Sequence, residues 1–272
     1  MRPPLLSINN QAIGVFDSGL GGLTVLKALE KQLPHESFIY FGDTAHVPYG
    51  SKSVETVQNY SNQITQFLLS HDVKLIVIAC NTASSVAAEV LRKKFDVPIF
   101  GVVTPAVEQA ISFHKNGEIG IIGTQATIAS NSYVDKFTSL APHINTVQQA
   151  CPLFVPLIEE DWGDTDTAKG VADIYLKSLA KHPVDALVLG CTHYPMMEKI
   201  IQSVVGNSVK LISSGPAAAK TVDNFLVKNN LQNDGKNSPT EAFFVTDFPQ
   251  KFDKLGSQFL GRALTNVHHI KL

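Results

Sequence analysis

The chain has 272 residues, of which 44% are hydrophobic and 17% are charged. An apolar content this high excludes an intrinsically disordered protein, and the length allows one large domain or two of ordinary size. The formal net charge is −2, from 22 basic and 24 acidic residues, so no overall positive field favours nucleic acid or an anionic membrane as a partner.

Short apolar runs alternate with amphipathic segments, a pattern typical of repeated βα units and a largely parallel sheet. Strands are predicted at 13–16, 38–41, 75–79, 99–103, 119–122, 146–150, 186–189, 209–212, 242–246 and 267–270. Helices are predicted from the turn after the first strand to 32, and at 53–69, 84–94, 106–114, 131–140, 167–181, 217–227 and 252–259. The rhythm restarts after Thr104-Pro105, which indicates a change of domain there.

Several classes of protein are excluded by what the sequence lacks. Three cysteines without a CxxC pair are too few for a disulfide framework, and the nine histidines show no HxxxH or HExxH spacing for a metal. The start of the chain lacks the apolar run of a signal peptide, and no stretch approaches the roughly 20 apolar residues of a membrane span. We therefore expect a cytoplasmic protein with no metal, membrane or nucleic-acid partner.

The residues that directly follow the predicted strands are the candidate ligand-binding groups. In open α/β sheets, ligands bind beyond the carboxyl ends of the strands. The residues at these positions are Asp17-Ser18, Asp43-Thr44, Cys80-Asn81-Thr82, Thr104, Thr124 and Cys191-Thr192-His193. Rich in hydroxyls and amides and poor in charge, this set suits a small polar ligand such as an amino acid.

The glycine-rich turn at 19–22 invites a dinucleotide-binding interpretation, with Asp43 in the place of a ribose-binding acid. Thr24 argues against it, because close packing of helix on strand needs Gly or Ala at that position. No GxxxxGK[ST] or GxSxG motif occurs, so P-loop and nucleophile-elbow enzymes are also excluded. The turn instead exposes backbone N–H groups that suit a carboxylate.

Cys80 and Cys191 each come at the end of an apolar strand and before a predicted helix N-terminus. A lone cysteine in such a place is most often a small buried hydrophobe, which remains the interpretation of Cys151. A helix N-terminus lowers the pKa of a thiol. Two thiols facing each other across a cleft could remove a proton from one face of a carbon and deliver one to the other. His193 is then a plausible acid/base or thiolate-orienting group.

Five segments, in order along the chain, resemble those of a known family. They are 14–24 (GVFDSGLGGLT), 40–50 (YFGDTAHVPYG), 79–84 (ACNTAS), 151–160 (CPLFVPLIEE) and 189–195 (LGCTHYP). By these motifs the chain resembles the bacterial glutamate racemases, which are cofactor-independent enzymes of the aspartate/glutamate racemase superfamily.

The resemblance implies roles for individual residues. Cys80 would act on D-glutamate and Cys191 on L-glutamate, with Asp17 and His193 as the groups that assist the two thiols. A further catalytic carboxylate falls on the Glu159-Glu160 pair; spacing to Cys191 favours Glu160, and Glu159 remains open. The implied substrate contacts are Asp17, Ser18, Tyr49, Gly50, Asn81, Thr82, Thr192 and His193.

The resemblance also implies the architecture and the biology. The expected fold is two similar three-layer α/β domains with mainly parallel sheets and the active site in the cleft between them. Residues 105–214 would form a second domain inserted into the first, which comprises 1–104 and 215–272. A cofactor-free homodimer supplying D-glutamate for peptidoglycan is expected. The alternatives are an aspartate or other amino-acid racemase, a non-catalytic amino-acid-binding protein and a dithiol redox protein.

Overall fold

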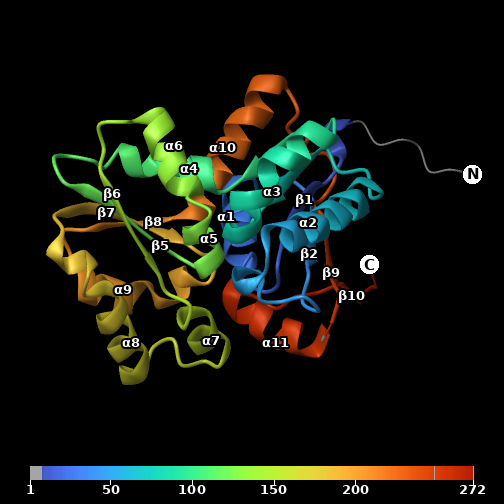
Figure 1. The fold of residues 1–272 in the computed structure, drawn as a ribbon. Helices are drawn as coiled ribbons and strands as arrows, with labels where there is room; N and C mark the ends of the chain where they lie inside the picture. Colours follow the sequence, from blue (N-terminus) through green and yellow to red (C-terminus); the bar gives the residue numbers. More distant parts are fainter. Residues whose placement is uncertain (1–7, 248, 272) are drawn as a thin grey trace, which may run out of the picture.

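Two parallel β-sheets lie side by side in the computed structural model, which describes residues 8–247 and 249–271 (Figure 1). The first sheet has the order β10-β9-β2-β1-β3-β4 and the second has the order β6-β5-β7-β8, with every neighbouring pair parallel. The first sheet contains β1 (Ile13–Asp17), β2 (Phe38–Gly42), β3 (Leu75–Ile78), β4 (Ile99–Gly101), β9 (Glu241–Val245) and β10 (Val267–His269). The second contains β5 (Glu118–Gly123), β6 (Thr146–Ala150), β7 (Val184–Gly190) and β8 (Lys210–Ser213). These sheets confirm the predicted fold class.

Helices cover both faces of each sheet. The long helices are α1 (Leu23–Gln32), α2 (Val54–Leu69), α3 (Asn81–Lys94), α4 (Val103–Ile111), α6 (Ser132–Leu140), α8 (Asp166–Leu176), α9 (Glu198–Val205), α10 (Ser214–Asn229) and α11 (Pro249–Leu260). Shorter helices are α5 (Gln125–Ala129) and α7 (Phe154–Glu159), with 3-10 turns η1 (Ile8–Asn10), η2 (Tyr49–Ser51), η3 (Leu179–Lys181) and η4 (Tyr194–Met197). None of the helices in the described part of the chain is both long and apolar enough to cross a membrane.

Alternation along the strands explains the layers. Val15 and Val77 pack into a core shared with α1, α10 and α11, whereas their neighbours Phe16 and Ile78 pack into a second core with α2 and α3. Strands that are buried on both faces read as continuous apolar runs, which is why the sequence located them so closely.

The connection between the sheets differs in detail from the expectation. The chain leaves the first sheet after Gly101 and enters α4 at Val103, so Thr104-Pro105 lies inside the first turn of α4. Proline is tolerated there because the N–H that it lacks would have no partner in the helix. The chain returns at Ser214, where α10 begins; α10 packs against both α1 and α4.

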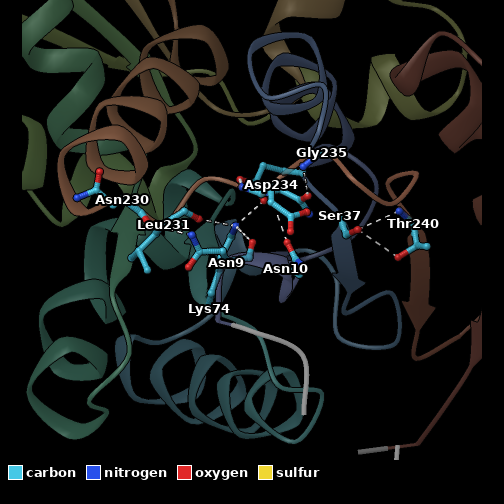
Figure 2. A network of polar contacts seen from close by, with 11 residues as sticks. Asn9, Asn10, Ser37, Lys74, Asn230, Leu231, Asp234, Gly235 and Thr240 are labelled. Carbon is cyan, nitrogen blue, oxygen red and sulfur yellow. Dashed lines mark hydrogen bonds and ion pairs between the residues drawn. The ribbon is translucent and has the colours of Figure 1, made fainter. Parts of the chain in front are cut away.

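A buried lysine joins the N-terminal turn to the segment that follows α10, as Figure 2 shows. The Lys74 ammonium, at the start of β3, donates to the carbonyl oxygens of Asn9 (2.7 Å) and Leu231 (2.8 Å). It also lies 2.5 Å from a carboxylate oxygen of Glu36. Burial lowers the pKa of Lys74, and Glu36 opposes that shift. The charge is thus held at the end of the first sheet away from the strand ends that carry the candidate site.

Candidate active site

Both predicted thiols line one cavity of about 330 Å³ between the two sheets. Cys80 follows β3 and Cys191 follows β7, and both side chains are buried. Of the predicted contacts, Ser18, Tyr49, Gly50, Asn81, Thr82, Thr192 and His193 also line the cavity. The carboxyl ends of the strands therefore bring together residues that lie far apart in the sequence.

The Cys80 thiol caps the N-terminus of α3. Its Sγ accepts a hydrogen bond from the Ala83 N–H (3.4 Å) and lies 3.8 Å from Ser18 Oγ. This cap starts α3 at Asn81, three residues earlier than the predicted helix. Burial and the nearby charge of Asp17 raise the pKa of Cys80 to about 12, although the Ala83 and Ser18 hydrogen bonds oppose that shift. Cys80 therefore retains its proton at neutral pH.

Asp17 is fully buried behind the turn that follows β1 and does not line the cavity itself. One carboxylate oxygen accepts a hydrogen bond from the Gly19 N–H at 2.9 Å. Burial raises the pKa of Asp17, while His193 and the hydrogen bonds from the turn oppose the shift. Asp17 is thus placed to act on Cys80 rather than to contact a ligand in the cavity, which is lined by its neighbours Ser18 and Gly19.

Cys191 has a different neighbour, the imidazole of His193. Cys191 Sγ lies 3.9 Å from His193 Nδ1, and His193 Nε2 lies 3.0 Å from Glu159 Oε1. Burial acts to lower the pKa of His193, but hydrogen bonds and charges from Cys191 and Glu159 outweigh it and raise the pKa to about 10. His193 is therefore an imidazolium at neutral pH, and it is the charged group that faces the Cys191 sulfur.

Glu159, rather than the residue favoured by spacing, is the carboxylate that contacts His193. Glu159 is the last residue of α7 and Glu160 is its C-cap, and both line the cavity. Successive positions on a helix differ in direction by about 100°, so chain distance from Cys191 does not reveal which carboxylate faces the imidazole. Glu159, which the sequence analysis kept as the alternative, is therefore the carboxylate that lies beside His193 in the structure.

Asp43 supports the cavity wall, a role that sequence reasoning missed. Buried at the end of β2, it accepts hydrogen bonds from the hydroxyls of Tyr49 (2.6 Å) and Thr246 (2.9 Å). Tyr49 begins the η2 turn, which carries Gly50 to the cavity. The position directly after β2 was the available signal, but it pointed to ligand contact rather than to support of a neighbouring loop.

The cavity carries several polar side chains among apolar ones but few cationic groups. Within the described chain, its lining includes no lysine or arginine. The same described residues contain no group of three or more His, Cys, Asp or Glu side chains arranged to hold a metal ion. Hydroxyls of Thr82 and Thr124, 3.0 Å apart, join the part of the chain built around the first sheet (the first unit) to the part built around the second sheet (the second unit). Hydroxyls, amides and backbone N–H groups are therefore the available partners for a ligand carboxylate, together with the imidazolium of His193.

Comparisons with known proteins agree with this geometry. The sequence model of the Asp/Glu/Hydantoin racemase family matches residues 13–222. A Geobacter metallireducens protein named glutamate racemase is 45% identical, over 96% of this chain and 97% of its own. The crystal structure of glutamate racemase isoform RacE1 from Bacillus anthracis superposes with a TM-score of 0.93 at 35% identity, covering 97% of this chain and 98% of that one. A Francisella tularensis glutamate racemase in complex with D-glutamate has a TM-score of 0.91 at 39% identity, with the same coverage.

The family model covers most of the chain, and the similarity to the relatives extends over nearly all of it at identities far above those that fold alone would require. The chain therefore belongs to the Asp/Glu/Hydantoin racemase family and groups there with the glutamate racemases.

Proposed function

We propose that this chain interconverts L- and D-glutamate by two-thiol proton transfer without a cofactor. The observation that carries the proposal is the pair of buried thiols at one cavity, each from a different sheet and each with its own polar partner. Inversion of a stereocentre needs a base on one face of the carbon and an acid on the other. Relatives named glutamate racemase identify the substrate class.

The two thiols begin the reaction in opposite protonation states. Cys191, which faces the imidazolium of His193, serves as the base for L-glutamate, while the raised pKa of Cys80 keeps its proton in place for donation. With L-glutamate bound, the Cys191 thiolate takes the α-proton and leaves a carbanion. Cys80 then delivers its own proton to the opposite face, which gives D-glutamate, a Cys191 thiol and a Cys80 thiolate. The reverse reaction uses the same groups with their roles exchanged.

Asp17 acts on Cys80 through its own protonation state: as a carboxylate it raises the pKa of the thiol and so keeps the proton on Cys80. A carboxylate beside a second anion would be repelled, but burial raises the pKa of Asp17, so the carboxyl takes up a proton more readily. A protonated Asp17 does not oppose the charge that appears on Cys80. Asp17 thus serves the Cys80 side as His193 and Glu159 serve the Cys191 side.

Stabilisation of the carbanion comes from fixed dipoles. The α-hydrogen of an amino acid is very weakly acidic, so negative charge that develops on the substrate must meet preorganised donors. Thr82 and Thr192 supply hydroxyl groups at the cavity wall, whereas the amide nitrogen of Asn81 already donates to Tyr133 and Ser214. Enclosure between the two units excludes water and strengthens each of these interactions.

The test is to incubate the purified protein with L-glutamate in D₂O, without added cofactor, and to follow ¹H NMR and circular dichroism together. Decay of the ellipticity to zero with replacement of the α-proton by deuterium is expected. Exchange without inversion would contradict the two-thiol mechanism. The same signals with aspartate but not glutamate would identify an aspartate racemase, silence with both would favour a binding protein, and a reversible disulfide on thiol titration would favour a redox role.

The remaining expectations rest on the resemblance to glutamate racemases. Residues 105–214 act as a domain inserted between 1–104 and 215–272, in line with the strand membership of the two sheets. The protein works in the cytoplasm as a homodimer, and its D-glutamate enters peptidoglycan synthesis. Light scattering of the purified protein tests the dimer, and rescue by D-glutamate of cells that lack the gene tests the role.

A further inference from the structure

Thr24, the residue that rules out a dinucleotide fingerprint, joins the two units beside the catalytic thiol of the second one. It lies in the first turn of α1, and its hydroxyl contacts two carbonyl oxygens, those of Gly21 (2.9 Å) and Thr192 (2.8 Å). Thr192 stands between Cys191 and His193. The hydroxyl of the first unit therefore anchors the backbone that carries the thiol and its imidazolium partner.

The glycine turn fits against the same segment. A Cβ added to Gly21 would lie 2.2 Å from Thr192 Oγ1 and 2.3 Å from His193 Nδ1, which is the nitrogen that faces Cys191 Sγ. On its other side the His193 ring meets the edge of Phe259, from α11 of the first unit, with ring centroids 5.3 Å apart. His193 thus belongs to the second unit by sequence, but much of its packing comes from the first.

We propose that Thr24 is a positioning residue for the Cys191 half of the reaction: its bond to the Thr192 carbonyl holds Cys191 and His193 in register with the glycine turn. The inference rests on the proposed racemisation, because it assigns Thr24 to one of two proton-transfer steps. Other bonds between the units, such as that of Thr82 with Thr124, lie on the Cys80 side of the cavity. We therefore expect the effect of Thr24 at the Cys191 step.

Isotope effects separate the two sides where ordinary kinetics do not. The enantiomers have equal free energy in water, so any variant changes kcat/KM equally in both directions. Deuterium at the α-carbon of L-glutamate reports abstraction by Cys191, and deuterium on D-glutamate reports abstraction by Cys80. Slowing the Cys191 step makes it more rate-limiting, which raises the isotope effect with labelled L-glutamate and lowers that with labelled D-glutamate.

The variant is Thr24→Val, which keeps the shape and removes the hydroxyl. We expect kcat to fall about 3- to 10-fold, the loss typical of a removed hydrogen bond that fixes a reacting group, with the two isotope effects moving in opposite directions as above. Thr24→Ser keeps a hydroxyl at this position and should show kcat and isotope effects close to those of the wild type. Thr221→Val is the matched control, because Thr221 donates only within α10, to Ala217 O at 3.1 Å, and should leave both rates and isotope effects unchanged.

Three results would overturn the inference while leaving the proposed function intact. They are wild-type kinetics in Thr24→Val, a fall in rate with both isotope effects unchanged, and a rise in the isotope effect with labelled D-glutamate instead. If Thr24→Val does not fold, Thr24→Ala is read in the same way. A wild-type protein that exchanges no α-proton would reject the proposed function itself, so the two failures are distinguishable.

Discussion

Cys80 and Cys191 occupy equivalent places at the carboxyl ends of β3 and β7, but their surroundings differ. Cys80 caps α3, a helix of 14 residues, and has a buried carboxyl group nearby. Cys191 is followed by a turn and the short η4, and it faces an imidazolium held by a carboxylate. In the proposed mechanism, these different neighbours make one of two equivalent backbone positions the acid and the other the base, which is the asymmetry that a two-base inversion needs at the start of each turnover.

Removal of either thiol is expected to have the largest effect. Cys80→Ala and Cys191→Ala should each lower racemisation by about 10²- to 10⁴-fold or more, because each variant lacks one of the two proton-transfer groups. Cys151→Ala is the control: this third cysteine is also buried but does not line the cavity, so turnover should stay close to that of the wild type. Circular dichroism with either enantiomer measures the rates. Near-normal turnover in Cys80→Ala or Cys191→Ala would contradict the mechanism.

Replacement of the assisting groups should cause smaller losses of rate, and the two replacements should raise the isotope effect with opposite enantiomers. Asp17→Asn and His193→Asn should each lower kcat by about 10²-fold, more than they raise KM, if both act on proton transfer. The α-deuterium isotope effect should rise with labelled D-glutamate in Asp17→Asn and with labelled L-glutamate in His193→Asn. A change in KM alone would reassign either residue to substrate binding, and identical isotope effects in the two variants would remove the distinction between the sides.

Replacement of the two neighbouring carboxylates tests which one supports His193. Glu159→Gln should lower kcat about 3- to 10-fold, because an amide holds the imidazolium less well than a carboxylate. Glu160→Gln removes the same charge one residue further on and should have the weaker effect, since the hydrogen bond to His193 comes from Glu159. Comparison of kcat in the two variants shows which carboxylate supports His193, and a larger loss in Glu160→Gln would reverse the assignment.

The stability of the protein should also change with pH, an effect that does not bear on turnover directly. The pKa of His193 rises from its ordinary value of 6.5 to about 10, with burial opposing and Cys191 and Glu159 driving the shift. Between these values the folded protein holds a proton that the unfolded chain has released. The stabilisation is therefore complete below about pH 6.5 and is lost as pH rises through about 10. Urea unfolding from pH 6 to 10 should show this decline in the wild type and a shallower one in His193→Asn; parallel curves would contradict it.

The sequence predicted the thiols and most contacts because strand ends in a parallel sheet converge on one edge. It also predicted a helix N-terminus directly after Cys191, but the helical segment begins later: the short η4 starts at Tyr194, with Pro195 in its first turn, and α9 starts at Glu198. The short α5 and α7 are missed because five or six residues show too little periodicity. The contact of Thr24 with Thr192 joins residues whose numbers differ by 168, and no local pattern in the sequence indicates it.

In the proposed mechanism, each turnover leaves the two thiols in protonation states opposite to those in which it began. After L-glutamate leaves as D-glutamate, the proton sits on Cys191 and Cys80 carries the charge, so the free protein is for a time suited to the enantiomer that it has just released. Both sulfurs are buried, and both line the cavity that the substrate would occupy. At saturating glutamate, return of the proton competes with arrival of the next substrate, and the history of the last turnover then influences the direction of the next.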